Sequence, residues 1–200
     1  GMKRSKWRVA VTGGIGSGKS AVLRMIGELG YPVFSADAIG RRIYEDDAVL
    51  RAVRARFPQC VRGDTVDRKA LADVVFADPD ALRALDEITH PAIMRRLFDA
   101  MDAAPGPLAF AEVPLLFESG TEGAFDRVVV VSRPLEARIR SAAERDGLTR
   151  EEVLARIQNQ FDYEKNPLDA HTVIDNDRDL AALRAEVGRA VRAIAREAEQ

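Results

Sequence analysis

The 200-residue chain has a single cysteine, Cys60, and no apolar run that approaches the roughly 20 residues needed to cross a bilayer. One cysteine cannot form an internal disulfide, which fits a reducing cytosol. Thirty basic residues against 32 acidic ones give a formal net charge of -2, which argues against a general nucleic-acid-binding protein. We therefore expect a cytoplasmic protein with neither a membrane nor a nucleic acid as partner.

What the sequence does contain is a series of short apolar runs with the character of β-strands. The run Val128 to Val131 is apolar without alternation, which is typical of a strand covered on both faces in a parallel sheet. Most segments between the runs have helical character, and such alternation predicts an α/β fold. The expected strands are Trp7–Val11, Pro32–Ser35, Leu108–Val113, Arg127–Ser132 and Thr172–Asp175.

The segments between these strands are expected to be helices. The first helix should begin near Gly18, bury Val22, Leu23, Ile26 and Leu29, and end at Gly30. The stretch Asp37 to Phe57 is also predicted to be helical. Residues 59–104 are predicted to be mostly helical with no convincing strand, and we interpret this section as an inserted helical subdomain.

Two further helical segments follow in the second half of the chain. Residues 134–166 are dense in arginine, and Thr149 with Glu152 forms a capping box that predicts the start of a helix after Gly147. Residues 179–199 form an amphipathic pattern with an arginine-rich face, which fits a solvated helix packed at the edge of the sheet.

A glycine-rich loop joins the first strand to the first helix. Gly13, Gly18, Lys19 and Ser20 satisfy the pattern G-x-x-x-x-G-K-S, with a strand before it and a helix after it as the mechanism requires. The glycines let backbone N–H groups turn inward toward phosphate oxygens, and the helix N-terminus adds its positive dipole end. Lys19 supplies charge for the β- and γ-phosphates, and the Ser20 hydroxyl can ligate Mg²⁺. The sequence therefore predicts a nucleoside triphosphate site.

Three classes of protein use such a loop: small-molecule kinases, GTPase switches, and motor or transport ATPases. The Asn-Lys-x-Asp motif that reads guanine is absent, and Asp37-Ala38-Ile39-Gly40 matches only a short GTPase pattern. "LAFAE", ending at Glu112, comes close to the apolar run and carboxylate of the ATPases, but the rest of their pattern is missing.

An arginine-rich helical segment favours the kinase class. Phosphoryl transfer needs positive charge around the moving group and exclusion of water, and a lid that carries arginines supplies both. Each arginine taken singly is better explained as a solvated side chain, but the group fits a lid over a phosphate site. The candidates are Arg138, Arg140, Arg145, Arg150 and Arg156.

An ordered set of motifs over nearly the whole chain resembles the dephospho-CoA kinase family. The loop T-G-G-I-G-S-G-K-S is present unbroken as Thr12 to Ser20, and P-L-L-F-E as Pro114 to Glu118. The remaining motifs are Ser35-Ala36-Asp37, Asp67-Arg68 with Leu71 and Phe76, His90-Pro91 with Ile93, Arg156-Ile157-Gln158-Asn159-Gln160, and Val173-Ile174-Asp175-Asn176.

The resemblance implies that ATP, with Mg²⁺, donates its γ-phosphate to the ribose 3′-hydroxyl of dephospho-CoA in the last step of coenzyme A synthesis. Asp37 would be the base or orienting carboxylate, and a helix N-cap is the alternative interpretation of this residue.

The resemblance also assigns the other site residues. Catalysis is assigned to Asp37, Lys19, Arg156 and Arg140, acceptor binding to Arg68, His90, Leu115 and Glu118, and metal binding to Ser20. ATP binding is assigned to Gly14, Ile15, Gly16, Ser17, Gly18, Lys19, Ser20, Ala21 and Asn176. For His90, a structural role in the insert is equally consistent with the sequence.

Four positions depart from the family pattern. Ser35 stands where the family has an aspartate, which leaves metal binding to Ser20, water and phosphates. Ser141 stands where the family has an arginine, and nearby Arg138 and Arg140 are candidates to replace it. His171 stands for an aspartate before the last strand, and Ala21 for a threonine after the loop.

The predicted architecture is an α/β P-loop nucleoside-triphosphate kinase fold, with a five-stranded parallel sheet flanked by helices. The nucleotide-binding core comprises residues 2–36, 105–133 and 167–200, the helical acceptor-binding insert 37–104, and the helical lid 134–166. A kinase for another nucleotide or nucleoside is the alternative function, and a regulatory nucleotide-binding protein without transfer activity is a further one. We expect a monomer or a weak oligomer.

Overall fold

The chain folds into two compact units, one of residues up to Ser35 and from Met101 on, the other Ala36–Ala100. The structure is a computed structural model that describes residues 6–163, 165, 166, 168 and 171–200. Residues 2–5 of the predicted core, and 164, 167, 169 and 170, lie outside the described residues. None of the described helices is long and apolar enough to cross a membrane.

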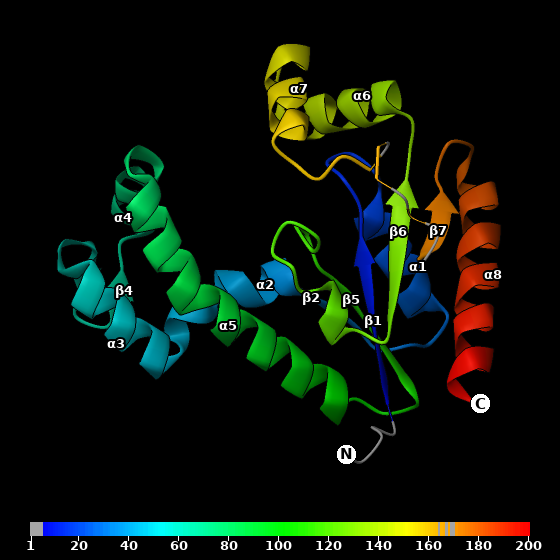
Figure 1. Cartoon of the computed structure of the whole chain (residues 1–200), viewed down its shortest axis with the longest axis horizontal. Helices are drawn as coiled ribbons and strands as arrows, with labels where there is room; N and C mark the ends of the chain where they lie inside the picture. The colour runs from blue at the N-terminus through cyan, green and yellow to red at the C-terminus, as the bar shows by residue number, and fades with distance from the viewer. Residues whose placement is uncertain (1–5, 164, 167, 169–170) are drawn as a thin grey trace. The chain divides into compact units, whose positions relative to one another are not determined.

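A five-stranded parallel sheet forms the centre of the first unit, in the order β2-β5-β1-β6-β7 (Figure 1). All five predicted strands are confirmed, with ends that differ by a residue at most. Their side chains are largely apolar because helices and neighbouring segments cover the sheet. The strands are β1 (Trp7–Thr12), β2 (Val33–Ser35), β5 (Leu108–Glu112), β6 (Arg127–Ser132) and β7 (Thr172–Asp175).

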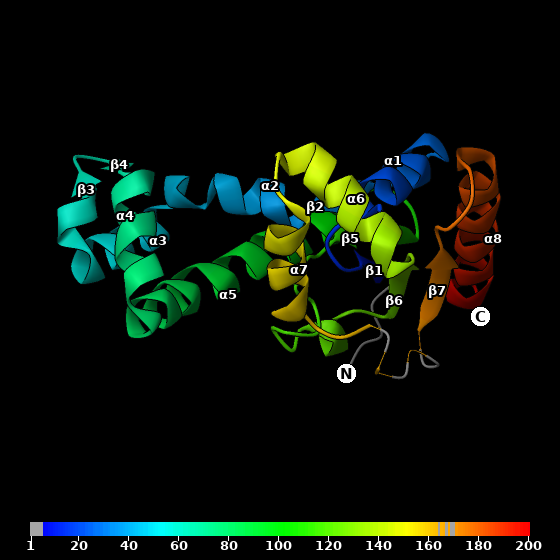
Figure 2. The same ribbon diagram turned by 90° about the horizontal axis from the view of Figure 1, so that it is seen from above.

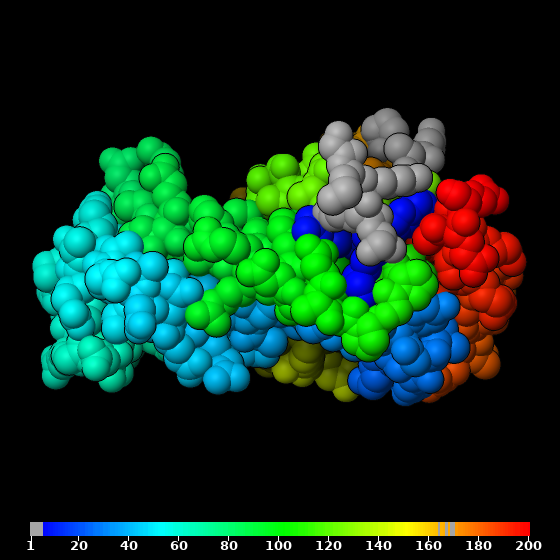
Figure 3. Space-filling model, turned by 90° about the horizontal axis from the view of Figure 1, so that it is seen from below, coloured from blue at the N-terminus to red at the C-terminus, as the bar shows by residue number. Residues whose placement is uncertain are grey.

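One face of the sheet is covered by α1 (Lys19–Glu28) and α8 (Leu180–Ala198), which pack against each other (Figures 2 and 3). Both helices bury residues at helical spacing on the strands. Asp179 caps α8 by accepting a hydrogen bond from the Ala182 N–H at 2.8 Å. The buried side chains of the two helices are Val22, Leu23, Met25, Ile26, Leu183, Val187, Val191 and Ile194.

The prediction that Leu29 is buried is wrong. Leu29 is the C-cap of α1 and is 52% exposed, because the helix ends before its side chain comes round to the sheet. Met25, which the sequence reading did not select, is buried instead. Gly30 does end the helix, with φ of 96° that favours glycine.

A helical hairpin follows β6 in the first unit, made of α6 (Leu135–Asp146) and α7 (Arg150–Gln158). Gly147 ends α6 with φ of 66°, and the predicted capping box starts α7. The Glu152 N–H donates to Thr149 Oγ1 at 3.1 Å, while that hydroxyl lies 3.2 Å from the Glu152 carboxylate. Figure 1 shows the hairpin beyond the carboxyl end of β6. Ligands in parallel α/β sheets bind at this end.

The second unit has its own small core, with Phe57 fully buried at its centre. Other buried members include Ile43, Val53, Cys60 and Leu71. The helices are α2 (Ala36–Arg41), α3 (Asp47–Arg56), α4 (Arg68–Ala77) and α5 (Pro79–Ala103), whose last residues belong to the first unit. Short 3-10 turns are η1 (Ile43–Glu45) and η2 (Pro58–Cys60), and the first unit has a third, η3 (Glu122–Ala124).

The prediction of no strand within residues 59–104 is wrong in one place. β3 (Val61–Arg62) and β4 (Thr65–Val66) pair as an antiparallel hairpin. Gly63, with φ of 59°, opens its two-residue turn. Two-residue strands are too short to leave an alternating pattern, which is why the sequence did not indicate them.

Candidate active site

The phosphate loop lies between β1 and α1, with a backbone that only glycine adopts readily at two positions. Gly16 has φ of 76° and Gly18 has φ of 94°. Gly18 is also the N-cap of α1, where no side chain among the described residues caps the helix and its first turn holds no acidic residue. The amides and the positive dipole end of α1 are therefore suited to an anion.

Two side chains that follow the loop far along the chain contact its backbone directly. Asn176, the residue after β7, donates from Nδ2 to the Ser17 carbonyl at 2.9 Å. Gln160, just after α7, accepts at Oε1 from the Ile15 N–H at 3.0 Å. The sequence placed Asn176 among the ATP-binding residues, and the structure brings it to the loop as a partner of the loop backbone.

A carboxylate that the sequence reading did not assign to the site lies beside Ser20. The Ser20 hydroxyl is 3.3 and 3.4 Å from the two carboxylate oxygens of Glu112, a buried side chain at the end of β5. The sheet register also pairs Glu112 with Ser35 on β2. The position where the family pattern has an aspartate is thus next to a carboxylate on the neighbouring strand.

These oxygen atoms fit a hard divalent cation. Within the described ranges, no three His, Cys, Asp or Glu side chains gather into a metal cage. Mg²⁺ is commonly held by one or two protein oxygens together with water and substrate phosphates. Ser20 and Glu112 supply that kind of donor set at the start of α1.

The arginines of the α6–α7 hairpin have different surroundings. Arg145 pairs with Asp146 at 3.1 Å through two parallel hydrogen bonds, which raise the pKa of Arg145, and the charge of Glu112 acts in the same direction. The pKa of Asp146 is lowered by the Arg145 hydrogen bonds first and also by the charge of Arg156. Arg156 and Asp146 are therefore electrostatic neighbours within the hairpin.

The other predicted lid arginines lie on the hairpin surface or against the loop. Arg150 makes a two-pronged ion pair with Glu136, one bond of which is 2.7 Å, and this pair lowers the pKa of Glu136. Arg140 is exposed on α6, near enough to Glu136 for its charge to act in the same direction. Arg138, by contrast, is 6% exposed and lies against the phosphate loop.

The P-L-L-F-E segment forms a strained turn after β5. Leu115 has φ of 56°, a left-handed backbone conformation that is uncommon for a residue other than glycine. Its apolar side chain is also 49% exposed. Such strain is concentrated at functional sites. Glu118 accepts at Oε2 from the Phe161 N–H at 3.3 Å, so it joins this segment to the chain that follows α7.

An aromatic cluster joins the same two segments. Phe117 stacks on Phe161 with ring centres 4.7 Å apart, and Tyr163 and His171 lie within 6.0 and 5.3 Å of the Phe117 ring. Burial raises the pKa of the Tyr163 hydroxyl, and a hydrogen bond with Thr12 opposes that rise. The imidazole ring of His171, one of the departures from the family pattern, therefore packs against the Phe117 ring in this cluster.

Asp37, Arg68 and His90 belong to the second unit. Asp37 is exposed in the first turn of α2, two residues beyond the end of β2. It lies within the helix and is not its N-cap, so the capping alternative is wrong. Arg68 opens α4, donates to the Arg41 carbonyl and lies over the Tyr44 ring at 5.2 Å. His90 precedes Pro91 inside α5, and its Nε2 has no hydrogen-bond partner among the described residues.

Comparison with known proteins assigns the family. The family model described as dephospho-CoA kinase matches residues 7–182. The chain belongs to the dephospho-CoA kinase family. A dephospho-CoA kinase of Thermus thermophilus is 41% identical over 175 residues, covering 88% of this chain and 85% of the relative. That of Deinococcus radiodurans is 41% identical over 189 residues, covering 92% and 91%.

A solved structure supports the same assignment. The dephospho-CoA kinase from Campylobacter jejuni superposes with a TM-score of 0.71 at 29% identity, over 95% of this chain and 98% of that one. The resemblance derived from the motifs is confirmed, and with it the P-loop kinase fold. The chain is an ATP-dependent kinase that phosphorylates dephospho-CoA in coenzyme A synthesis. The GTPase and ATPase alternatives are not supported.

Three residues that contact the loop or Ser20 were not predicted from the sequence: Glu112, Gln160 and Arg133, whose Nη1 donates to the Gly16 carbonyl at 3.1 Å. In the sequence Glu112 ends an ATPase-like apolar run, and its place at the carboxyl end of a buried strand is a signal that points to the site. Gln160 stood within a family motif without a role. Arg133 left no signal, because only the fold brings it to the loop.

Proposed function

We propose that this dephospho-CoA kinase transfers the γ-phosphoryl group of ATP to the 3′-hydroxyl of the acceptor ribose, with Asp37 as the base. The observation that carries the proposal is the phosphate loop, which leads into α1 with no capping side chain among the described residues and with Ser20 next to Glu112. The products are CoA and ADP. In this family that arrangement fits a donor site for a triphosphate.

The donor is bound by residues 14–21 of the loop and the first turn of α1, with Asn176 supporting the loop from β7. The loop N–H groups donate hydrogen bonds to the phosphate oxygens, and Lys19, the first residue of α1, adds its ammonium charge. Ser20 and Glu112 would hold Mg²⁺, which when bound neutralises charge on the β- and γ-phosphates.

The transfer step requires a proton acceptor and positive charge. The carboxylate of Asp37 takes the proton of the ribose hydroxyl as its oxygen bonds to the γ-phosphorus, and the bond from that phosphorus to the β-phosphate oxygen breaks. Arg156 and Arg140, on the hairpin, stabilise the charge that develops on the transferred group. Lys19 stabilises the leaving phosphate.

The acceptor is bound by two sets of residues. Leu115 and Glu118, in the strained turn after β5, form an apolar wall and a polar edge. Arg68 and His90, in the second unit, supply a cation and an imidazole for the polar groups of dephospho-CoA. His90 suits this role because a buried, unpartnered imidazole nitrogen is costly unless something binds it.

The test is ADP release from MgATP, with and without dephospho-CoA, in the wild type and in Asp37→Asn. We expect release that depends on dephospho-CoA and falls in the variant by about 10²- to 10⁴-fold, the usual contribution of a general base. The matched control is Asp47→Asn, because Asp47 is also an exposed carboxylate in the first turn of a helix in the second unit. Unchanged turnover in Asp37→Asn would show that Asp37 is not the base. ADP release that does not depend on dephospho-CoA would show that dephospho-CoA is not the acceptor.

A further inference from the structure

Three consecutive carbonyl groups of the phosphate loop are each held by a side chain from another part of the first unit. Arg138 Nε donates to the Ile15 carbonyl at 3.0 Å, and Arg133 Nη1 donates to the Gly16 carbonyl at 3.1 Å. Asn176 Nδ2 donates to the Ser17 carbonyl at 2.9 Å. We call Arg133, Arg138 and Asn176 the collar of the loop.

The collar fixes the direction of the loop amides. In a trans peptide the carbonyl of one residue and the N–H of the next point to opposite sides. Holding the Ile15 and Ser17 carbonyls therefore turns the N–H groups of Gly16 and Gly18 away from the collar. The Ser17 N–H, the amide between them, donates to the Gly14 carbonyl at 3.1 Å and closes the turn. The collar thus presets the orientation that a phosphate site requires.

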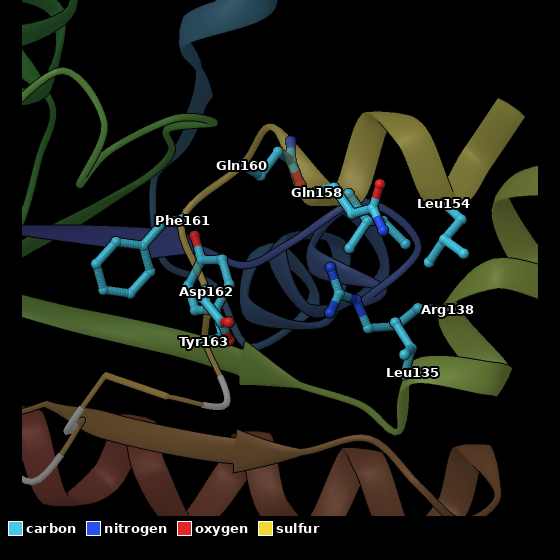
Figure 4. A pocket seen from close by; sticks show the side chains of 9 residues that line it. Leu135, Arg138, Leu154, Gln158, Gln160, Phe161, Asp162 and Tyr163 are labelled. Carbon is cyan, nitrogen blue, oxygen red and sulfur yellow. The ribbon is translucent and has the colours of Figure 1, made fainter. Parts of the chain in front are cut away.

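Arg138 is buried against the phosphate loop. Its side chain is 6% exposed, and Figure 4 shows it pointing from α6 to the loop, at a cavity of about 280 Å³. A Cβ at Gly14 would collide with its guanidinium, and one at Gly16 would collide with its backbone carbonyl. Burial of a guanidinium is costly unless it is well hydrogen-bonded. The burial of Arg138 against the loop therefore indicates that its hydrogen bond to the loop has a function.

Arg133 accounts for one departure from the family pattern. Besides the Gly16 carbonyl, its Nη1 donates to the Ser141 hydroxyl at 2.5 Å. Position 141 therefore faces the same stretch of the loop, and an arginine there would need the space that the Arg133 guanidinium takes. The sequence suggested Arg138 and Arg140 as replacements, whereas Arg138 and Arg133 are the arginines that contact the loop.

We propose that Arg133 and Arg138 are positioning residues for the triphosphate: their hydrogen bonds to the loop carbonyls orient the loop N–H groups toward the phosphates. Arg133, together with Ser141, takes the place of the arginine of the family pattern. The inference rests on the donor half of the proposed function, ATP binding at the loop. It is independent of the acceptor and of Asp37.

The first test compares ATP and adenosine binding without any acceptor, in the full chain, by NMR titration. Arg138→Gln should weaken MgATP binding by about tenfold or more, as expected for loss of a charged hydrogen bond, and leave adenosine binding within about twofold. Arg138→Lys should recover part of the loss. The control is Arg189→Gln, because Arg189 is an exposed arginine paired with Glu186 on α8. Equal losses for ATP and adenosine, or no loss, would overturn the role of Arg138.

The second test exchanges two residues and remains decisive even if Arg138→Gln does not fold. Arg133→Ser alone should weaken MgATP binding several-fold, and adding Ser141→Arg should restore it to within about threefold of the wild type. A double variant as weak as Arg133→Ser, or a single variant as strong as the wild type, would refute the replacement. Normal ATP binding with no transfer to dephospho-CoA would instead count against the proposed function.

Discussion

Glu112 is the residue whose substitution tests the cation site most directly. Glu112→Gln keeps the size of the side chain but removes the charge beside Ser20. We expect the Mg²⁺ concentration for half-maximal activity to rise by about tenfold to a hundredfold, the range seen when groups that support a metal are removed. The measurement is a Mg²⁺ titration of ADP release at fixed ATP.

Glu144→Gln, at an exposed position of α6, is the control for the loss of one negative charge. If Glu112→Gln lowered the maximal rate but left the Mg²⁺ dependence unchanged, Glu112 would act on the loop and not on the cation.

The residues of the candidate site that could be predicted from the sequence are those that lie together in one continuous segment of the chain. Lys19 and Ser20 follow from the loop pattern itself, since strand, loop and helix are continuous in the chain. The contact of Ser20 with Glu112 was not predictable, because it depends on which strand pairs with β1 and in what register. Similarly, Arg138 and Arg140 are equally plausible in sequence, and only the rotation of α6 decides which one is buried against the loop.

At the scale of elements, Asp46 links the stability of α3 to pH. Its carboxylate accepts from the Val49 N–H at 3.1 Å and pairs with Arg96, and these bonds lower its pKa from the ordinary value of 3.8. A lowered folded-state pKa stabilises the fold above pH 3.8, and this contribution is lost as the pH falls through the folded-state pKa. Asp46→Asn should therefore be less stable than the wild type at pH 7, with a difference that shrinks toward pH 3.

Denaturant unfolding of both proteins at several pH values measures this difference. Asparagine also caps helices well, so the variant isolates the charge. A difference that stayed constant from pH 7 to pH 3 would show that the carboxylate charge contributes nothing.

Elements were predictable where a pattern extends over several turns or a whole buried strand. The five sheet strands are apolar runs, and α7 and α8 begin at capping residues that the sequence displays. The β3–β4 hairpin and the exposed Leu29 were not predictable, since the first is too short to show periodicity and the second depends on where α1 ends.

On the scale of the whole molecule, the two units have separate cores, and this predicts that they respond separately to core damage. Phe57→Ala removes a fully buried ring from the second unit and should lower its stability by about 3–5 kcal/mol. Amide hydrogen exchange should then speed up within residues 36–100 and remain slow in the sheet.

Phe110→Ala, in the sheet, is the reciprocal variant and should accelerate exchange in the first unit. If either substitution accelerated exchange equally in both units, the two cores would unfold as one cooperative block.

The position of β1 in the sheet has a consequence for the nascent chain. β1 leaves the ribosome long before its two neighbours in the sheet, β5 and β6, are made. Leu108, which starts β5, follows Thr12 by 108 − 12 = 96 residues. At about 5–20 residues per second, β1 waits about 5 to 20 seconds for a partner. Ala36–Ala100 is complete within that interval, so the inserted unit can pack its core while the strand that leads into the phosphate loop is still unpaired.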